Sequence, residues 1–481
     1  MLDRDLESIQ AVRDLMRNAK IASEALAEFS QEQLDRVCAE IAKEGAANAK
    51  RLAKLACEET GFGIWQDKVL KNQLGSSMTW DAWKGTRCVG MLKEDKAAGL
   101  WEIGVPVGIV AALIPSTNPT STTLYKAIIS LKAGNAIVFS PHPGAKRCIL
   151  ATIELIQQAA KRAGAPEHAV QSITLTTMEA TNALLTHRDV GMILATGGEA
   201  MVKAAYSSGN PAIGVGPGNG PAFIEQSADI PTAVRHIIQS KSFDNGTVCA
   251  SEQSVVTESC ISQSVEGEFK KQGGYFLSEN ESERLGKILL RSNGTMNPQI
   301  VGKPAEVIAK MAGISVPVET KVLISKQSET SHLNPYAREK LCPVLAWYVE
   351  PDWEDACARC IALLHVEGVG HTMAIHSKNE AVIREFALKK PVSRLLVNTP
   401  AALGGVGATT ALSPALTLGC GAIGGSATSD NVGPLHLINI RRVAFGVKEA
   451  RSQTQEASSD LHITPEQIAE ITRKVMERLN L

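Results

Sequence analysis

The sequence predicts an α/β protein built on doubly wound parallel sheets. An almost unbroken apolar run over 105–114 is typical of a strand that is buried on both faces. A helical pattern over 122–133 follows it, and a second apolar run occupies 136–140. Another helical pattern extends over 145–163. Buried strands that alternate with helices indicate a parallel sheet covered by helices on both faces.

Length and composition indicate a soluble protein of two or three domains. The chain has 481 residues, of which 44% are apolar and 21% charged, as in ordinary globular proteins. Its net charge of −1 gives no overall field for nucleic acid or an anionic membrane, and neither is expected as a partner. The N-terminus lacks a signal region, and no apolar run reaches bilayer-spanning length. The ten cysteines are scattered, which favours reduced thiols and a cytoplasmic location.

The segment before the first strand is predicted to be helical. Apolar residues recur at helical spacing over 3–59, and Ser30-Gln31-Glu32-Gln33 is a capping-box candidate for the start of a second helix. Residues 97–104 are expected to form a short extended segment. Nothing in this part of the chain indicates chemistry.

Three loops follow the carboxyl ends of predicted strands, where doubly wound sheets bind their ligands. Gly197 and Gly198 in the third loop would let backbone N–H groups face a phosphate. The glycine-rich run 214–220 lacks the spacing of a dinucleotide fingerprint at the start of a helix. The three loops are 115–120, 140–144 and 196–199, the last between a strand over 190–195 and a helix over 199–206.

Cys249 lies at the centre of the most informative stretch, 240–255. The polar run Asp244-Asn245-Gly246-Thr247 precedes it, and Ser254 to Thr257 reads as the start of a buried strand. Cys249 is therefore predicted at a turn that a substrate could reach. A thiolate is intrinsically very nucleophilic, but buried unreactive thiols are common, so the position alone leaves both interpretations open.

A second α/β segment is predicted from Cys249 to about Leu412. Its strands are expected over 343–349 and 371–376, with a helix over 353–364. Within that helix, Cys357 and Cys360 lack a second Cys or His pair at ligand spacing, so no metal site is expected. Residues 404–433, rich in Gly, Ser and Thr, are expected to be loops near a ligand or a subunit contact.

The end of the chain differs in composition. Residues 448–460 are polar and featureless, as in a linker. Thr464, Pro465 and Gln467 then provide helix-starting signals, and an apolar face follows with Ile468, Ile471, Val475 and Leu479. A short amphipathic helix is marginal alone and is expected to dock on its own body, a sister subunit or another partner.

Six motifs, in this order along the chain, are similar to those of the aldehyde dehydrogenase superfamily and of its CoA-acylating branch. The resemblance covers roughly residues 5 to 447. It is greatest to the acetaldehyde and propionaldehyde dehydrogenases of bacterial microcompartments and to the aldehyde half of bifunctional alcohol/aldehyde dehydrogenases. The motifs are Ile114-Pro-Ser-Thr-Asn-Pro119, Ala195-Thr-Gly-Gly198, Gly214-Val-Gly-Pro-Gly-Asn219, Phe243-Asp-Asn-Gly-Thr-Val-Cys-Ala-Ser-Glu252, Glu339-Lys-Leu-Cys-Pro-Val344 and Thr428-Ser-Asp-Asn431.

The resemblance implies the aldehyde dehydrogenase fold. Its parts would be a doubly wound cofactor-binding domain (1–87 and 107–243), an α/β catalytic domain (244–423), a small oligomerisation flap (88–106 and 424–447), a linker (448–462) and an amphipathic helix (463–481) similar to an encapsulation peptide. A homo-oligomer, either a dimer or a tetramer, is expected from the flap. Microcompartment shell proteins are the partner that the helix implies, with a location inside such a compartment in the cytoplasm.

The resemblance also assigns the site. Cys249 would add to the aldehyde, Asn118 would donate to the thiohemiacetal oxygen, and hydride would pass to a nicotinamide to leave an acyl-Cys thioester. His371 is a candidate acid/base group for the CoA thiol. The implied cofactor-binding residues are Ile114, Pro115, Ser116, Ser140, Pro141, His142, Thr196, Gly197, Gly198, Gly216, Glu339 and Leu341, with Glu339 on the nicotinamide ribose. Many members carry a Lys-Pro pair where this chain has Ser140-Pro141, which leaves NADP open beside the expected NAD.

One departure concerns release of the acyl group. Hydrolytic members keep a general-base glutamate where this chain has Gly214-Val215-Gly216-Pro217. An acyl-Cys without such a base should persist until a thiol attacks it, so coenzyme A is the expected co-substrate. Three alternatives stay open: hydrolysis with Glu225 or Glu252 as the base, a polar substrate such as sulfoacetaldehyde, and an inactive shell-associated scaffold.

Overall fold

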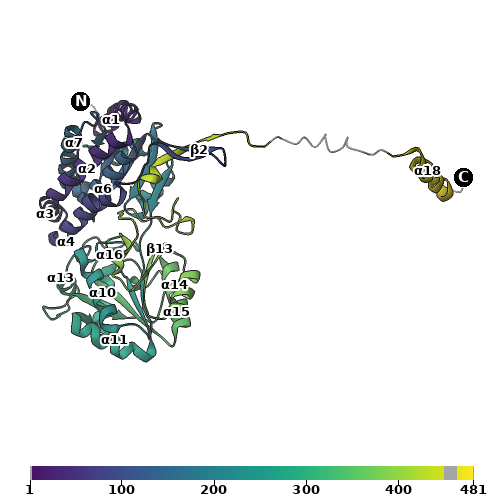
Figure 1. Cartoon of the computed structure of the whole chain (residues 1–481). Coiled ribbons are helices and arrows are strands. Elements are labelled where there is room, and N and C mark those ends of the chain that lie inside the picture. Colours follow the sequence, from purple (N-terminus) through teal and green to yellow (C-terminus); the bar gives the residue numbers. More distant parts are fainter. Residues whose placement is uncertain (1–2, 449–462, 480–481) are drawn as a thin grey trace.

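The computed structural model describes residues 3–448 and 463–479, and within them it has two parallel sheets and one small antiparallel sheet (Figure 1). The predicted α/β class is confirmed. The first sheet has the strand order β5-β4-β3-β6-β7, and all its pairs are parallel. Its strands are β3 (Ile109–Ile114), β4 (Ala136–Pro141), β5 (Val170–Ser172), β6 (Val190–Thr196) and β7 (Ala212–Val215).

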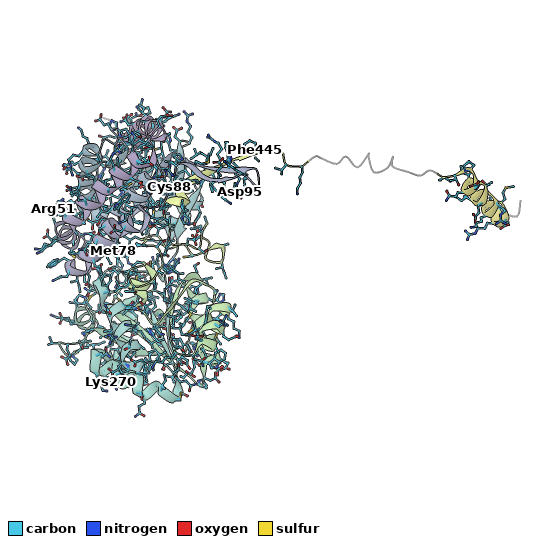
Figure 2. The ribbon with its side chains drawn as sticks, in the orientation of Figure 1. Arg51, Met78, Cys88, Asp95, Lys270 and Phe445 are labelled. Carbon is cyan, nitrogen blue, oxygen red and sulfur yellow. The ribbon has the colours of Figure 1, made fainter. Side chains whose placement is uncertain are left out.

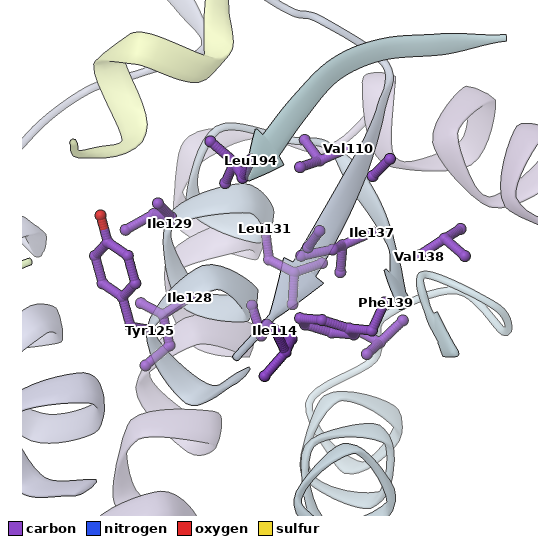
Figure 3. Close-up of a cluster of buried hydrophobic side chains, with 14 of the residues drawn as sticks. Val110, Ile114, Tyr125, Ile128, Ile129, Leu131, Ile137, Val138, Phe139 and Leu194 are labelled. Atoms are coloured by element: carbon purple, nitrogen blue, oxygen red, sulfur yellow. The ribbon is translucent and has the colours of Figure 1, made fainter. Parts of the chain in front are cut away.

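Helices from the N-terminal half cover this sheet. Figure 3 shows Leu131 of α6 beside Ile137 of β4, and both side chains are buried. The predicted capping box at Ser30 is present and starts α2. The helices are α1 (Arg4–Ala27), α2 (Gln31–Ala47), α3 (Ala49–Thr60), α4 (Trp65–Gln73), η1 (Leu74–Met78), α5 (Thr79–Trp83), α6 (Pro119–Lys132), η2 (Pro143–Ala145), α7 (Lys146–Arg162), α8 (Met178–Leu185) and α9 (Glu199–Tyr206).

The second sheet has the order β10-β11-β12-β9-β8-β13-β14, again all parallel. By sheet membership the chain passes from the first sheet to the second between β7 and β8, earlier than the expected domain boundary at 243. The strands are β8 (Pro221–Ile224), β9 (Ser254–Glu258), β10 (Gly274–Phe276), β11 (Val322–Lys326), β12 (Val344–Glu350), β13 (Gly370–His376) and β14 (Val392–Val397). The helices are α10 (Ile230–Ser242), η3 (Phe243–Gly246), α11 (Ser259–Gln272), α12 (Glu279–Leu289), α13 (Ala305–Met311), η4 (Pro335–Ala337), α14 (Trp353–Val366), α15 (Glu380–Lys389) and α16 (Ala401–Gly405).

The antiparallel sheet joins β1 (Gly90–Asp95), β2 (Leu100–Pro106) and β15 (Ile438–Ala444), segments far apart in the sequence. It projects from the first sheet, with Asp95 and Phe445 near its tip and Cys88 near its base (Figure 2). The prediction of one strand over 105–114 is wrong, because the run is divided between β2 and β3. Gly108 separates them with φ 107°, a left-handed conformation that favours glycine.

Two predicted helices can also be compared with the structure. The helix expected to begin at Thr122 begins at Pro119, because proline is favoured in the first turn and Asn118 is the N-cap residue. The C-terminal helix is confirmed as α18 (Pro465–Leu479), which begins with reciprocal hydrogen bonds between Thr464 and Gln467. Apart from Lys448, the expected linker lies outside the described residues. No described helix is long and apolar enough to cross a membrane.

Candidate active site

Cys249 follows a turn built from successive left-handed residues. Asp244, Asn245 and Gly246 have φ angles of 50°, 51° and 77°, which is unusual for the two residues that are not glycine. Asn245 is held by a hydrogen bond of 2.9 Å from its Nδ2 to the carbonyl of Gly302. The predicted turn is therefore present, and the predicted strand after Cys249 is β9.

The carboxylate of Asp244 anchors this turn to helix α4. Its Oδ1 accepts the backbone N–H of Ile64 at 2.7 Å, and its Oδ2 accepts from Lys68 at 2.8 Å and from Lys71. Burial pushes the pKa of Asp244 upward, but the two ammonium groups outweigh it and the pKa lies below its usual value. Asp244 is therefore a buried carboxylate, and its two lysine partners come from one face of α4.

Cys249 and Asn118 line one pocket. Thr196, from the cofactor set, lines it as well. The other lining residues are Leu70, Lys71, Leu74, Phe243, Val248, Ala402, Leu403, Val406, Ala408, Leu416 and Leu418. The wall is almost wholly apolar, and no carboxylate is among these lining residues.

Burial raises the pKa of the Cys249 thiol to about 12. The carboxyl group of Glu339 adds to this increase, whereas the guanidinium of Arg394 opposes it. Arg394 is itself buried, and its donors go to neutral acceptors, among them the carbonyl of His371 at 3.2 Å and Oγ1 of Thr372 at 3.2 Å. Without a ligand, Cys249 is therefore a neutral thiol near pH 7.

Glu339 is linked to the nucleophile through Gly218. Its Oε1 accepts the N–H of Gly218 at 2.9 Å, and a Cβ added to Gly218 would lie 1.8 Å from the carbonyl oxygen of Cys249. Burial raises the pKa of Glu339 to about 8. Glu339 is thus close enough to Cys249 to influence the ionisation of the thiol, although it does not line the pocket.

His371 does not line the pocket either. It is the second residue of buried strand β13, and its Nδ1 lies 2.9 Å from Oγ1 of Thr372. Burial, with a further contribution from Arg394, lowers the pKa of His371 to about 3, so the imidazole is neutral. Its Nε2 has no hydrogen-bond partner among the described residues. That free nitrogen is consistent with an acid/base role, which remains a prediction.

The expected cofactor loops lie along one edge of the first sheet, because β3, β4 and β6 are parallel neighbours. Ser140 is buried, with its Oγ 3.0 Å from Oγ1 of Thr181, and His142 is exposed. Gly198 is the N-cap of α9, so the predicted strand-to-helix turn is present, and its role toward a phosphate stays a prediction. The residues at this edge are Ile114, Pro115, Ser116, Ser140, Pro141, His142, Thr196, Gly197 and Gly198. Gly216 follows β7, and Leu341 follows Lys340 in the loop before β12.

The two glutamates considered as hydrolytic bases lie outside the pocket. β8 and β9 are parallel, with Pro221 beside Ser254. Glu225 follows the carboxyl end of β8, whereas Cys249 precedes the amino end of β9, so the two residues lie at opposite ends of these strands. The proposal of Glu225 as the base is therefore wrong on geometry. Glu252 is buried, its Oε1 accepts the N–H of Ala401 at 3.0 Å, and burial raises its pKa to about 7.

Three polar residues of this region were not predicted from the sequence: Lys68, Lys71 and Arg394. The two lysines stand three residues apart on a helix and resemble ordinary surface lysines. Arg394 lies in a strand without a motif. Only the contacts described above identify these residues.

Comparison with known proteins agrees with this geometry. The model of the aldehyde dehydrogenase family matches residues 6–278. The chain belongs to that family. The predicted family and the predicted fold are thereby confirmed.

Three similar proteins place the chain within the family. The bifunctional aldehyde-alcohol dehydrogenase AdhE of Escherichia coli is 44% identical over 442 residues, which are 91% of this chain and 50% of that protein. The chain therefore spans about half the length of this relative. The structure of an acetylating aldehyde dehydrogenase from Geobacillus thermoglucosidasius has a TM-score of 0.93 and 48% identity, covering 94% of this chain and 100% of that one. A propionaldehyde dehydrogenase from the Clostridium phytofermentans fucose utilisation bacterial microcompartment has a TM-score of 0.83 and 28% identity, covering 90% and 97%.

Proposed function

We propose that the protein oxidises a short-chain aldehyde with NAD and transfers the acyl group to coenzyme A. The thiolate of Cys249 adds to the carbonyl carbon, and Asn118 donates to the resulting oxyanion. The thiohemiacetal carbon passes hydride to the nicotinamide and becomes an acyl-Cys thioester. The CoA thiol then loses its proton and displaces Cys249, which gives acyl-CoA, NADH and one proton.

The lining of the Cys249 pocket supports this proposal most directly. Its only ionic side chain is Lys71, whose charge is already paired with Asp244, so no free cation among the lining residues awaits a sulfonate or carboxylate. An anionic aldehyde would lose its hydration there without a counter-ion. The lining therefore favours a neutral aliphatic aldehyde over sulfoacetaldehyde.

The absence of a carboxylate from the lining residues supports CoA over water as the acyl acceptor. Water needs a general base within hydrogen-bond reach, about 2.6–3.2 Å, whereas a thiol is a better nucleophile toward a thioester. Gly218 itself cannot carry such a base, because a Cβ there would lie 1.8 Å from the carbonyl oxygen of Cys249. The inactive scaffold is not favoured, because Cys249 and Asn118 share one pocket.

The test is NADH formation from NAD and propionaldehyde, with and without CoA. We expect one NADH per active site without CoA and steady turnover with CoA, with propionyl-CoA as the product. Cys249→Ala should abolish both phases, whereas Cys260→Ala, which removes an exposed thiol, should change neither. Steady release of free acid without CoA would contradict the proposal.

The side chain of Glu59, which is bound at the N-terminus of α7, favours NAD over NADP. This helix follows the cofactor loop 140–144, and its free N–H groups would suit a phosphate. Glu59 already accepts two of them, from Arg147 and from Cys148, at 2.7 Å each. A carboxylate at this place repels a 2′-phosphate. Glu59→Gln should therefore raise the ratio of kcat/KM for NADP over NAD by about tenfold, as expected for about 1.4 kcal/mol of lost repulsion. An unchanged ratio would contradict this role.

A homo-oligomer assembled through the projecting sheet is the proposed quaternary structure. β15 forms an outer strand of that sheet, and Ile440 and Phe445 are about half exposed at 43% and 50%. An unpaired strand edge is a ready surface for a second copy. Ile440→Glu should lower the molecular mass measured by light scattering, and an unchanged mass would rule out this interface.

A microcompartment shell protein is the proposed partner of α18. The helix leaves Ile468, Ile471 and Val475 exposed on one side, which suits a groove in a partner. Ile471→Glu should abolish co-purification with shell proteins without changing turnover, and Glu470→Gln should change neither. Loss of turnover in Ile471→Glu would instead place the helix in the enzyme body.

A further inference from the structure

Lys71 is a buried lysine in the wall of the Cys249 pocket. Its side chain is 5% exposed, and it comes from α4, whereas Cys249 and Asn118 come from loops of two different sheets. A buried ammonium group is costly unless every N–H finds an acceptor. The acceptors around Lys71 therefore indicate what this residue does.

The ammonium group of Lys71 has more acceptors than protons. It donates to Oδ1 of Asn118 at 2.7 Å, to the carboxylate of Asp244, and to the carbonyl and Oγ1 of Thr247 at 3.2 Å each. An ammonium group only donates hydrogen bonds, and an amide side chain has one accepting end and one donating end. Lys71 can therefore face only the oxygen of Asn118.

This contact decides which end of the Asn118 amide is available to the substrate. With Oδ1 on Lys71, Nδ2 carries the two remaining N–H groups, and one of them reaches Oγ1 of Thr117 at 3.2 Å. The other is free for an oxyanion in the pocket. A reversed amide would present a lone pair to the same oxyanion and oppose its formation.

We propose that Lys71 is the positioning residue of the oxyanion hole, holding the Asn118 amide with its N–H toward the substrate oxygen. This inference depends on the proposed role of Asn118 in aldehyde oxidation. Lys71 also polarises the amide, because a charged donor on Oδ1 strengthens the hydrogen bond that Nδ2 gives.

Lys71 has little freedom to do anything else. Its charge is paired with Asp244, and that carboxylate is fixed by the N–H of Ile64 and by Lys68. Asp244 and Thr247 belong to the turn that leads to Cys249, so the same ammonium group ties the oxyanion donor to the nucleophile loop. A charged substrate group would have to displace one of these partners.

The test is a double-mutant cycle of Lys71→Met and Asn118→Ala. The readout is the rate of the NADH burst with NAD and propionaldehyde but no CoA, which follows thiohemiacetal oxidation alone. Asn118→Ala should slow it by about 10²–10³-fold and Lys71→Met by about 10–10²-fold. Because Lys71 acts through Asn118, the double variant should be within about threefold of Asn118→Ala.

Three further measurements separate positioning from structural damage. Lys71→Gln, whose amide can still donate to Oδ1 of Asn118, should recover part of the burst rate and covers the case in which Lys71→Met does not fold. Lys68→Met removes the other lysine partner of Asp244. Lys68 contacts the carbonyl of Thr117 and not the Asn118 amide, so this variant should slow the burst clearly less than Lys71→Met. Alkylation of Cys249 by iodoacetamide, which forms no oxyanion, should be unchanged in Lys71→Met.

The outcomes are distinct. The role of Lys71 would be overturned if the wild-type protein showed a burst that Lys71→Met did not slow. It would also be overturned if the rate losses of the two single variants multiplied in the double variant. If Lys68→Met slowed the burst as much as Lys71→Met did, the effect would belong to the turn as a whole and not to the contact between Lys71 and Asn118. No burst in the wild-type protein would refute the proposed function instead.

Discussion

Replacing Gly218 with alanine tests how closely the chain approaches the nucleophile. A Cβ at this position would lie 1.8 Å from the carbonyl oxygen of Cys249 and 2.7 Å from its carbonyl carbon. Normal contact between carbon atoms is about 3.5–4.0 Å, so one of the two segments has to move by more than about 1 Å. A displacement of about 1 Å at a reacting group can cost about 10²-fold in rate.

We therefore expect Gly218→Ala to slow the NADH burst by at least about 10²-fold and to destabilise the fold by about 1–3 kcal/mol, as overpacked sites do. The burst is measured by stopped flow with NAD and propionaldehyde, and folding by circular dichroism. Gly267→Ala is the control, because a Cβ there, in α11, meets nothing within 4 Å. A burst rate for Gly218→Ala within about threefold of wild type would refute the reasoning.

Three other predictions concern the charges around Cys249. In the protein without ligands, alkylation of Cys249 by iodoacetamide should become about tenfold faster per pH unit from pH 7 to 9, because a pKa of about 12 keeps the thiolate a minor species. A rate that reached a plateau below pH 8 would contradict this. Arg394→Met should slow that alkylation by about tenfold, which is one pKa unit, since the guanidinium opposes the increase; equal rates would exclude the effect. His371→Ala should spare the burst but slow CoA-dependent turnover by about 10²–10⁴-fold, and equal losses in both would exclude a role in the CoA step.

The sequence located the parts of the site that lie in loops next to predicted strands. Cys249 follows an Asn-Gly turn, and Asn118 precedes a proline that starts a helix, so both positions carry local signals. The structure confirms the turn and strand β9, and it brings the two residues into one pocket. Their chemical roles are not local and came from the family resemblance.

The parts that sequence could not predict depend on contacts between distant segments. Lys71 becomes part of the site only because α4 packs against a turn that comes 173 positions later in the chain. The run 105–114 looked like one strand because both pieces are apolar, yet β2 turns away at Pro106 to pair with β15. Periodicity reports burial, and it does not report which sheet buries a segment.

The apolar wall around Cys249 accounts for two features of the proposed reaction. The apolar wall raises the pKa of the thiol, which makes the resting cysteine a poor target for alkylation and oxidation. The same wall offers no carboxylate to activate water, so an acyl group on Cys249 should outlast its formation until a thiol enters. A substitution that makes the wall polar, such as Leu418→Glu, would therefore be expected to speed hydrolysis of the acyl-enzyme and to weaken the need for CoA. If Leu418→Glu still required CoA for every turnover while its acyl-enzyme formed normally, water exclusion by this wall would not be the reason that the thioester persists.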